Sequence, residues 1–127
     1  MKKLISMMAT SAVALLGLAL PATATPLPPF TATVHTVTAT QLGKSWREGC
    51  PVPPEDLRLI RMTVLGFDGH PYRGELVVAE AVTPELVTIF ARLYESRFPI
   101  ERMETVDKYD ADDDLSMAAN NTSAFNC

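Results

Sequence analysis

The feature that most constrains the fold is a pair of apolar segments separated by a turn. In the first, residues 57–65, apolar residues alternate with Arg61 and Thr63, which is the two-residue period of a strand with one buried face. Residues 67–74 then carry Asp-Gly, Pro and Gly, which favour turns. A second short apolar segment follows at 75–80. The sequence therefore predicts a β-hairpin with a longer loop, built from strands at 57–65 and 75–80.

A helix is predicted directly after the hairpin. Thr83 can cap free amides, Pro84 suits the first helical position, and Glu85 suits the positive end of a helix. The apolar residues then recur at helical spacing on one face: Leu86, Ile89, Phe90, Leu93 and Tyr94. The helix should end near Arg97, because the residue before Pro99 is disfavoured in helical conformation.

The rest of the chain completes an α+β pattern. A third strand is predicted at 100–106, followed by an acidic loop at 109–114, one helical turn at 115–119 and the start of a further strand at 124–127. The order β-β-α-β predicts a small antiparallel or mixed sheet with one packed helix. No internal repeat is present.

The N-terminus has the features of a secretory signal peptide. Lys2 and Lys3 precede an apolar run that is broken by Pro21, and the small residues Ala22-Thr23-Ala24 follow. We expect residues 1–24 to be the signal peptide, with cleavage after Ala24 and no stable membrane insertion afterwards. The alternative is an uncleaved membrane anchor, although the run is near the lower limit for spanning a bilayer.

Residues 25–45 are rich in Thr and Pro, which predicts a linker that tethers the domain or a loose N-terminal arm. A weak strand is possible at 33–38 because of its β-branched residues. The domain itself is predicted to span 46–127. It starts with an ordered loop, because the proline content of 46–54 disfavours both a helix and a central strand.

Charge and cysteine content limit the partners and the compartment. Removing Lys2 and Lys3 leaves 9 basic residues against 15 acidic ones, a net charge of −6, which argues against nucleic acid as the main partner. Export places Cys50 and Cys127 in an oxidising compartment, where one disulfide closing a loop of nearly eighty residues is the simplest outcome. Two free thiols are the alternative. Nothing in the sequence indicates an oligomeric state.

No complete catalytic constellation is present. The only histidines, His35 and His70, lie in the predicted linker and in the hairpin turn, and there is no H-x-x-x-H or C-x-x-C spacing for a zinc site. Ser116, Ser123 and Cys127 have no histidine close in sequence that would activate them as nucleophiles. The residues alone therefore predict no catalytic group and no metal ligand. Asn120-Asn121-Thr122-Ser123 contains overlapping acceptor motifs for N-glycosylation.

Three alternating aspartates, Asp110, Asp112 and Asp114, match the first ligands of a calcium-binding loop. The match then fails, because Leu115 stands where Gly is required and Asn121 stands where Glu is required. A solvated acidic loop is the favoured interpretation. A weak extracellular calcium site is the alternative.

Four segments together resemble a known family. They are 45–52 (SWREGCPV), 66–69 (GFDG), 74–78 (GELVV) and 116–127 (SMAANNTSAFNC). Their order and spacing are similar to the N-terminal half of exported M15-type zinc peptidases, of the D-alanyl-D-alanine carboxypeptidase-like branch that acts on peptidoglycan stem peptides. The resemblance covers residues 45–127, and the last segment is its most specific part.

The resemblance implies a fold, a substrate and a cofactor. In that family an arginine that polarises the scissile carbonyl follows the last segment. A Ser-x-His-x-x-Gly-x-Ala-x-Asp motif then supplies two zinc ligands, and neither element is found in this sequence. We therefore expect the N-terminal part of a secreted peptidase, from a truncated or frameshifted gene or from a longer sequence, without catalytic zinc and without activity. Zinc would be expected only for a complete member. The alternative function is a non-enzymatic secreted module that binds the cell wall or a partner.

Three residues are predicted to contact substrate on the same basis. Asn121, Thr122 and Ser123 would lie near the rim of the family's cleft and bind peptidoglycan stem peptides. Their alternative role is to form turns and backbone hydrogen bonds. The resemblance also places a bridge between Cys50 and Cys127, joining the loop at the start of the domain to the approach to the cleft.

Overall fold

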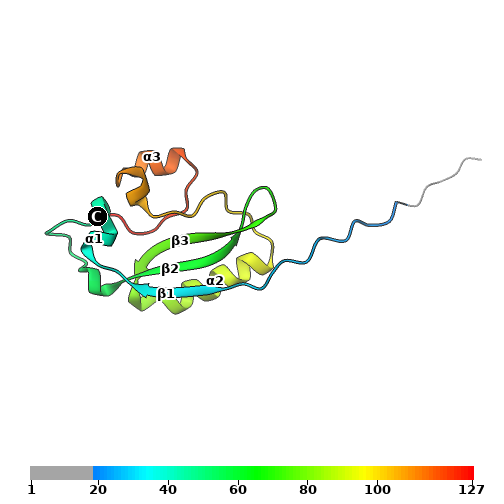
Figure 1. The fold of residues 1–127 in the computed structure, drawn as a ribbon, viewed down its shortest axis with the longest axis horizontal. Helices are drawn as coiled ribbons and strands as arrows, with labels where there is room; N and C mark the ends of the chain where they lie inside the picture. Colours follow the sequence, from blue (N-terminus) through cyan, green and yellow to red (C-terminus); the bar gives the residue numbers. More distant parts are fainter. Residues whose placement is uncertain (1–18) are drawn as a thin grey trace, which may run out of the picture.

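The computed structural model describes residues 19–127 and shows an α+β domain around a three-stranded antiparallel sheet in the order β1-β2-β3. The main helix, α2, lies across one face of the sheet, and the part of the chain that follows α2 runs past the β3 edge (Figure 1). The predicted signal peptide falls largely outside the described residues. Within them, no helix is long and apolar enough to cross a membrane.

The predicted hairpin is present at the centre of the sheet. It consists of β2 (Leu57–Leu65) and β3 (Pro71–Ala79), with Ile60 opposite Leu76. The second strand begins four residues earlier than its predicted start. The reason is a tight loop: the amide of Gly66 donates to the carbonyl of His70 at 2.8 Å, so pairing continues almost to the turn.

The helix α2 (Thr83–Glu95) covers the face of the sheet formed by the even-numbered residues of the hairpin. Phe90 packs into a core cluster made by Ile60, Met62, Val64, Leu76 and Val78. Ile89, predicted on this face, is 50% exposed, and Val87 packs against the cluster. Thr83 does not cap the helix, because it is itself the first helical residue, and its hydroxyl donates to the carbonyl of Ala79 at 3.2 Å.

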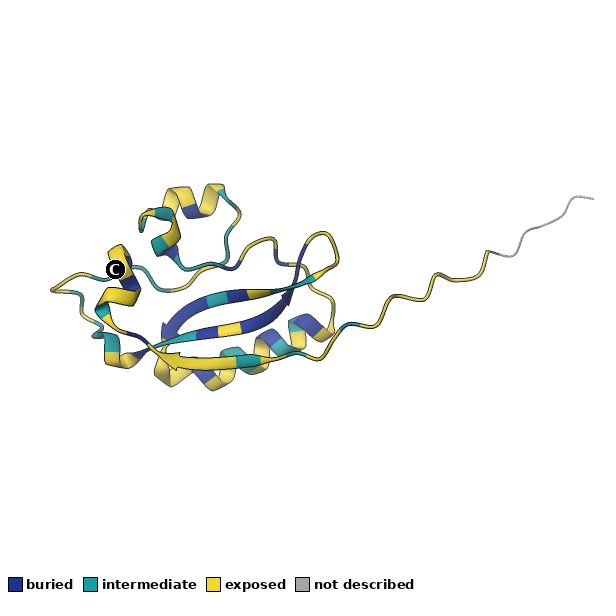
Figure 2. Ribbon diagram, viewed as in Figure 1, coloured by how far each residue is buried: buried dark blue, intermediate teal, exposed yellow. Residues whose placement is uncertain are grey.

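The third strand of the sheet is β1 (Ala32–Thr36), which pairs antiparallel with β2. The weak strand considered at 33–38 is therefore present, whereas the rest of the predicted linker at 25–45 is more ordered than expected. The same stretch also forms the short helix α1 (Ala39–Leu42) and a 3₁₀ turn at Gly43–Ser45. These elements contain few apolar residues, so the sequence indicates them only weakly. In particular, β1 lies at the sheet edge and is exposed along most of its length (Figure 2). Polar contacts stabilise this stretch where apolar burial is small: Thr38 and Gln41 form a capping box at α1.

The predicted strand at 100–106 is not a strand of the sheet. Residues Ile100, Met103 and Val106 are buried, but at a spacing of three, so this segment meets β3 at single points. One such contact is the amide of Glu75, which donates to the carbonyl of Met103 at 2.8 Å. Gly74 permits this approach, because a Cβ there would lie 2.7 Å from the sulfur of Met103. The segment covers the β3 edge, which would otherwise expose unpaired backbone groups.

The C-terminal segment completes the domain. A 3₁₀ turn at Val106–Tyr109 leads to α3 (Asp113–Ala118), which contains most of the predicted helical turn at 115–119. Residues 124–127, predicted as a strand, have no regular secondary structure, although the amide of Phe125 donates to the carbonyl of Val77 at 3.2 Å. Cys127 is bonded to Cys50 in a disulfide whose Cα atoms are 6.1 Å apart. Two further 3₁₀ turns, Pro54–Asp56 and Glu80–Val82, flank the hairpin.

Candidate functional site

The face of the sheet opposite α2 carries two adjoining hollows that share Arg61 and Glu75. The first, which we call the charged groove, has a volume of about 550 Å³ and is lined chiefly by charged side chains: Arg61, Arg73, Glu75, Glu101, Arg102, Glu104 and Lys108. The second, which we call the apolar pocket, has a volume of about 220 Å³. Its apolar lining residues are Val37, Leu42, Leu59, Val77 and Phe125, and the polar residues Gln41, Ser45, Thr105 and Asp107 also line it.

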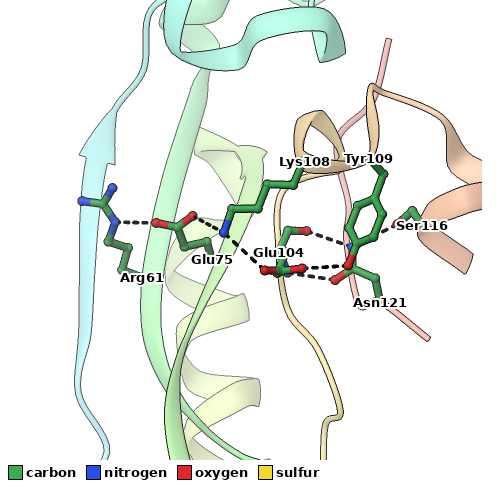
Figure 3. A network of polar contacts seen from close by, with 7 residues as sticks. All are labelled: Arg61, Glu75, Glu104, Lys108, Tyr109, Ser116 and Asn121. Atoms are coloured by element: carbon green, nitrogen blue, oxygen red, sulfur yellow. Dashed lines mark hydrogen bonds and ion pairs between the residues drawn. The ribbon is translucent and has the colours of Figure 1, made fainter. Parts of the chain in front are cut away.

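Ion pairs of alternating sign run across the charged groove (Figure 3). Arg61 Nε lies 2.8 Å from one carboxylate oxygen of Glu75, and Lys108 Nζ lies 3.7 Å from the other. Lys108 Nζ also lies 3.4 Å from Glu104. The Arg61 and Lys108 side chains are 48% and 50% exposed, so both cations remain accessible from solvent. An exposed ion pair contributes little to stability, which leaves these charges available to a ligand.

Glu104 is held in its ionised form by its neighbours. The hydroxyl of Tyr109 donates to Glu104 Oε2 at 2.7 Å, and this hydrogen bond, together with the charge of Lys108, lowers the pKa of Glu104 below its ordinary value of 4.5. Burial and the same hydrogen bond raise the pKa of Tyr109. The pair therefore presents a carboxylate and a protonated phenol over the neutral pH range.

Tyr72 closes the groove at the edge of β3. Its hydroxyl donates to the carbonyl of Ile100 at 3.0 Å. Burial, reinforced by the negative charges of Glu104 and Glu101, raises the pKa of Tyr72 to about 12. The phenol is thus a stable neutral donor that fixes the segment beside β3 rather than a group that exchanges protons near neutral pH.

The three predicted substrate residues have different environments. The side chain of Asn121 bonds to both backbone groups of Glu104, at 2.9 and 3.0 Å, and donates to Ser116 Oγ at 2.9 Å. The amide of Thr122 donates to the carbonyl of Arg102 at 2.9 Å, and Ser123 is exposed. The structure therefore brings Asn121 and Thr122 next to groove-lining residues. Contact of these residues with a substrate stays a prediction.

The apolar pocket contains one unusual polar group. Ser45 lines it and is 3% exposed, and its Oγ has no hydrogen-bond partner within residues 19–127. The Ser45 backbone is fixed, because its carbonyl accepts from the amide of Cys127 at 2.9 Å. At the rim, Asp107 accepts a hydrogen bond from the amide of Lys44 at 2.7 Å. A buried hydroxyl without a partner costs free energy, so its presence requires an explanation.

Zinc does not fit the residues present. His35 lies on β1 and its ring contacts Thr33 at 3.0 Å, whereas His70 lies in the hairpin loop, 3.5 Å from Asp68. Both cysteines are in the disulfide. Residues 19–127 contain no group of three or more His, Cys, Asp or Glu side chains that could hold a metal ion. No catalytic step is therefore derived through zinc for this chain.

The acidic loop does not gather its carboxylates either. Asp110 pairs with Lys44, and this contact lowers the pKa of Asp110 and raises that of Lys44. Asp112 instead accepts a hydrogen bond from the amide of Leu115 at 2.9 Å and caps α3. Since Asp110 and Asp112 each have a structural partner of their own, the loop gives no support to the alternative of a calcium site.

The sequence analysis did not identify the charged groove. It noted Arg61 only as a residue on the polar face of a strand. The four-residue spacing of Glu104 and Lys108 indicates pairing when the two residues lie on a helical turn, but the sequence predicts a strand at 100–106, which includes Glu104. The pairing of these residues with Glu75, about thirty positions away, has no local sequence signal.

Comparison of the chain with protein-family models, with curated proteins and with solved structures gives no match. The two hollows are therefore interpreted from their own chemistry. The charged groove is suited to a ligand with both cationic and anionic groups. The apolar pocket combines apolar side chains with polar ones such as Gln41, Thr105 and Asp107, so it is suited to a small group with both apolar and polar parts.

Proposed function

We propose that this domain binds peptides that carry both carboxylate and ammonium groups, as peptidoglycan stem peptides do. The observation that carries the proposal is the alternating series Arg61–Glu75–Lys108–Glu104 along the charged groove. A bound peptide can replace these exposed ion pairs with its own, one carboxylate on Arg61 and one ammonium on Glu104. Such exchange favours specificity for a charge pattern over high affinity.

The wider context of the proposal is the resemblance to M15-type peptidases. In that context the domain is the N-terminal part of a secreted D-alanyl-D-alanine carboxypeptidase-like enzyme, and it contributes binding surface rather than catalytic groups. The basic and apolar N-terminus supports export. The Cys50–Cys127 disulfide is consistent with an oxidising compartment.

The alternative, a non-enzymatic module that binds the cell wall, is favoured by one observation. The two histidines lie on separate elements and both cysteines are oxidised, so the four residues most typical of zinc sites are not gathered. Saturable retention of the protein on purified peptidoglycan, by a cooperatively folded monomer, would support a module. Retention without saturation, or a protein without a cooperative unfolding transition, would count against it.

Titration of the purified protein with L-Ala-γ-D-Glu-L-Lys-D-Ala-D-Ala, followed by NMR, tests the proposed binding. We expect saturable shifts at groove residues that weaken as salt is raised. Lys108→Gln should weaken binding. Arg92→Gln, an exposed change on α2 on the opposite side of the sheet, should not. Equal effects of the two variants, or no shift at groove residues, would reject the proposal.

A further inference from the structure

We infer that the apolar pocket is a binding site for a primary alkylammonium group, a cationic head on a short unbranched apolar chain, such as the end of a lysine side chain. The inference does not rest on peptide binding in the charged groove, because Asp107, which would bind the cationic head, lines only the apolar pocket. Arg61 and Glu75 are the residues that belong to both hollows.

The carboxylate of Asp107 is the first part of the argument. Its Oδ1 accepts a hydrogen bond from the amide of Lys44 at 2.7 Å. Its Oδ2 makes no hydrogen bond within residues 19–127, and it is not among the polar atoms that are buried there without a partner, so it stays open to solvent. An ammonium group in the pocket can bond to this oxygen without displacing a bond of the protein.

The backbone holds that carboxylate in place. Gly43 approaches it so closely that a Cβ at this position would overlap the carboxylate, and the φ of +56° at Gly43 is a conformation that suits glycine. The close approach and the hydrogen bond from Lys44 fix the carboxylate against the 3₁₀ turn Gly43–Ser45. An anion that is already positioned loses little freedom when a cation binds to it.

The charge of Asp107 is not neutralised by a partner within residues 19–127. Arg61 pairs with Glu75 at 2.8 Å and Lys44 pairs with Asp110, whereas Asp107 is in no ion pair. Asp110, and to a smaller extent the charge of Asp107, raise the pKa of Lys44. The field of Asp107 therefore favours a cation nearby, and an anionic ligand would be repelled.

The walls of the pocket suit the apolar chain. The hollow measures about 220 Å³ and has Leu59, Val77 and Phe125 among its lining residues. A cavity of about 150 Å³ with an apolar lining accommodates benzene, which has more heavy atoms than butylammonium, so the chain fits the volume. Lysine side chains bind in this way within proteins, with the stem along apolar surface and the head at a polar partner.

Titration of the purified protein with n-butylamine, 1-butanol and butyrate, at neutral pH and constant ionic strength, tests the inference. The three molecules share an apolar chain and differ in the charge of the head. We expect butylamine to give saturable NMR shifts at pocket-lining residues, with 1-butanol binding about three- to fivefold more weakly, the value of a partly exposed ion pair. Butyrate should bind more weakly than 1-butanol. Methylamine, a head without the chain, should bind at least about fivefold more weakly than butylamine.

Three variants separate the charge of Asp107 from a general effect on the fold. Asp107→Asn keeps the oxygen that accepts from the Lys44 amide, and it should weaken butylamine about three- to fivefold and leave 1-butanol unchanged. Asp114→Asn, which removes an exposed carboxylate of α3 outside the pocket, should change neither ligand. Leu59→Phe narrows the pocket from β2 and should weaken both ligands, so it provides a second test if Asp107→Asn unfolds.

Four results would overturn the inference. They are equal binding of butylamine and 1-butanol, tighter binding of butyrate than of butylamine, a butylamine preference that survives Asp107→Asn, and butylamine shifts spread over surface carboxylates without saturation at the pocket. An absence of butylamine shifts at pocket residues, in a protein whose charged groove still responds to the stem peptide, would reject this inference alone and leave the proposed peptide binding standing.

Discussion

The side-chain amide of Asn121 bonds to both backbone groups of Glu104: Oδ1 accepts from the Glu104 amide at 2.9 Å and Nδ2 donates to the Glu104 carbonyl at 3.0 Å. The Asn121 side chain thus gives the Glu104 backbone the two hydrogen bonds that a neighbouring strand would otherwise give. Through Ser116 Oγ, it also joins this segment to α3. The wall of the charged groove is held in position by this arrangement (Figure 3).

Asn121→Ala should destabilise the domain, because it leaves both backbone groups of partly buried Glu104 without their partner. We expect a loss of about 2 kcal/mol in the free energy of unfolding, measured by urea denaturation. Asn120→Gly removes the hydrogen bond of the exposed neighbour to Glu101 and suits its positive φ of 52°, so it should cost less than about 0.5 kcal/mol. Equal losses for the two variants would contradict the structural role given to Asn121.

The two buried serines should respond differently to removal of their hydroxyl groups. Ser116→Ala deletes a hydrogen bond to Asn121 and should cost about 1 kcal/mol. Ser45→Ala removes a hydroxyl that has no partner, so unfolding free energy should stay the same or rise slightly. Thermal or urea unfolding of both variants without ligand checks this. A larger loss for Ser45→Ala than for Ser116→Ala would show that Ser45 is bonded in solution.

Glu104 should contribute to the acid sensitivity of the fold. Its pKa is lower in the folded protein than its ordinary value of 4.5, so its contribution to stability is present above pH 4.5 and is lost as pH falls through the folded value. Glu104→Gln should flatten the decline of stability below pH 4.5 and cost less than about 1 kcal/mol at pH 7, since the pairs it makes are partly exposed. Urea unfolding at a series of pH values measures both effects.

The matched control for that series is Glu95→Gln, an exposed change at the end of α2. It should reproduce the acid transition of the unmodified protein. A decline of stability that is the same for the unmodified protein and for Glu104→Gln would mean that another carboxylate controls the acid response.

Reduction of the disulfide should weaken the whole domain. The bond links residues 77 positions apart, for which the chain-entropy model gives about 4 kcal/mol. The Cys50→Ser, Cys127→Ser double variant should show a lower unfolding midpoint and faster hydrogen exchange at the amide of Phe125, which bonds to Val77. Full protection of that amide in the double variant would show that the segment is held without the disulfide.

The protein should not release D-alanine from stem peptides when zinc is added. The chain has two histidines, on separate elements, and no other cluster of metal-binding side chains among residues 19–127. Incubation of the purified protein with zinc and muropeptides, with D-alanine quantified by chromatography, provides the measurement. Metal-dependent release above a chelator control would reject the prediction.

Local sequence patterns predicted the hairpin and the helix, because each depends on a period that neighbouring residues display. The strand Leu57–Leu65 and the start of α2 at Thr83 agree with the predicted bounds. By contrast, β1 was only weakly indicated, because an exposed edge strand needs few apolar residues. The segment 100–106 is not a strand, because its buried residues Ile100, Met103 and Val106 recur every three positions, whereas a strand with one buried face repeats every two.

The candidate site was harder to predict than the fold. The pairing of Cys50 with Cys127 was expected from their number and the export signal. The charged groove joins Arg61 on β2 to Lys108 in a 3₁₀ turn, and only the folded chain brings them together. Ser45 had no distinguishing signal at all, since an unpartnered hydroxyl is a property of its surroundings.

The walls of the apolar pocket have a consequence for folding kinetics. Ser45 and Phe125 are eighty positions apart in the chain, and both must be in place beside Val77 before the pocket exists. Contacts of such long sequence separation form slowly, because the entropy of closing the intervening loop opposes them. During synthesis or refolding the hairpin can pair early, whereas the pocket is complete only after the last residues have docked. A ligand of the pocket would therefore bind only molecules that have finished folding.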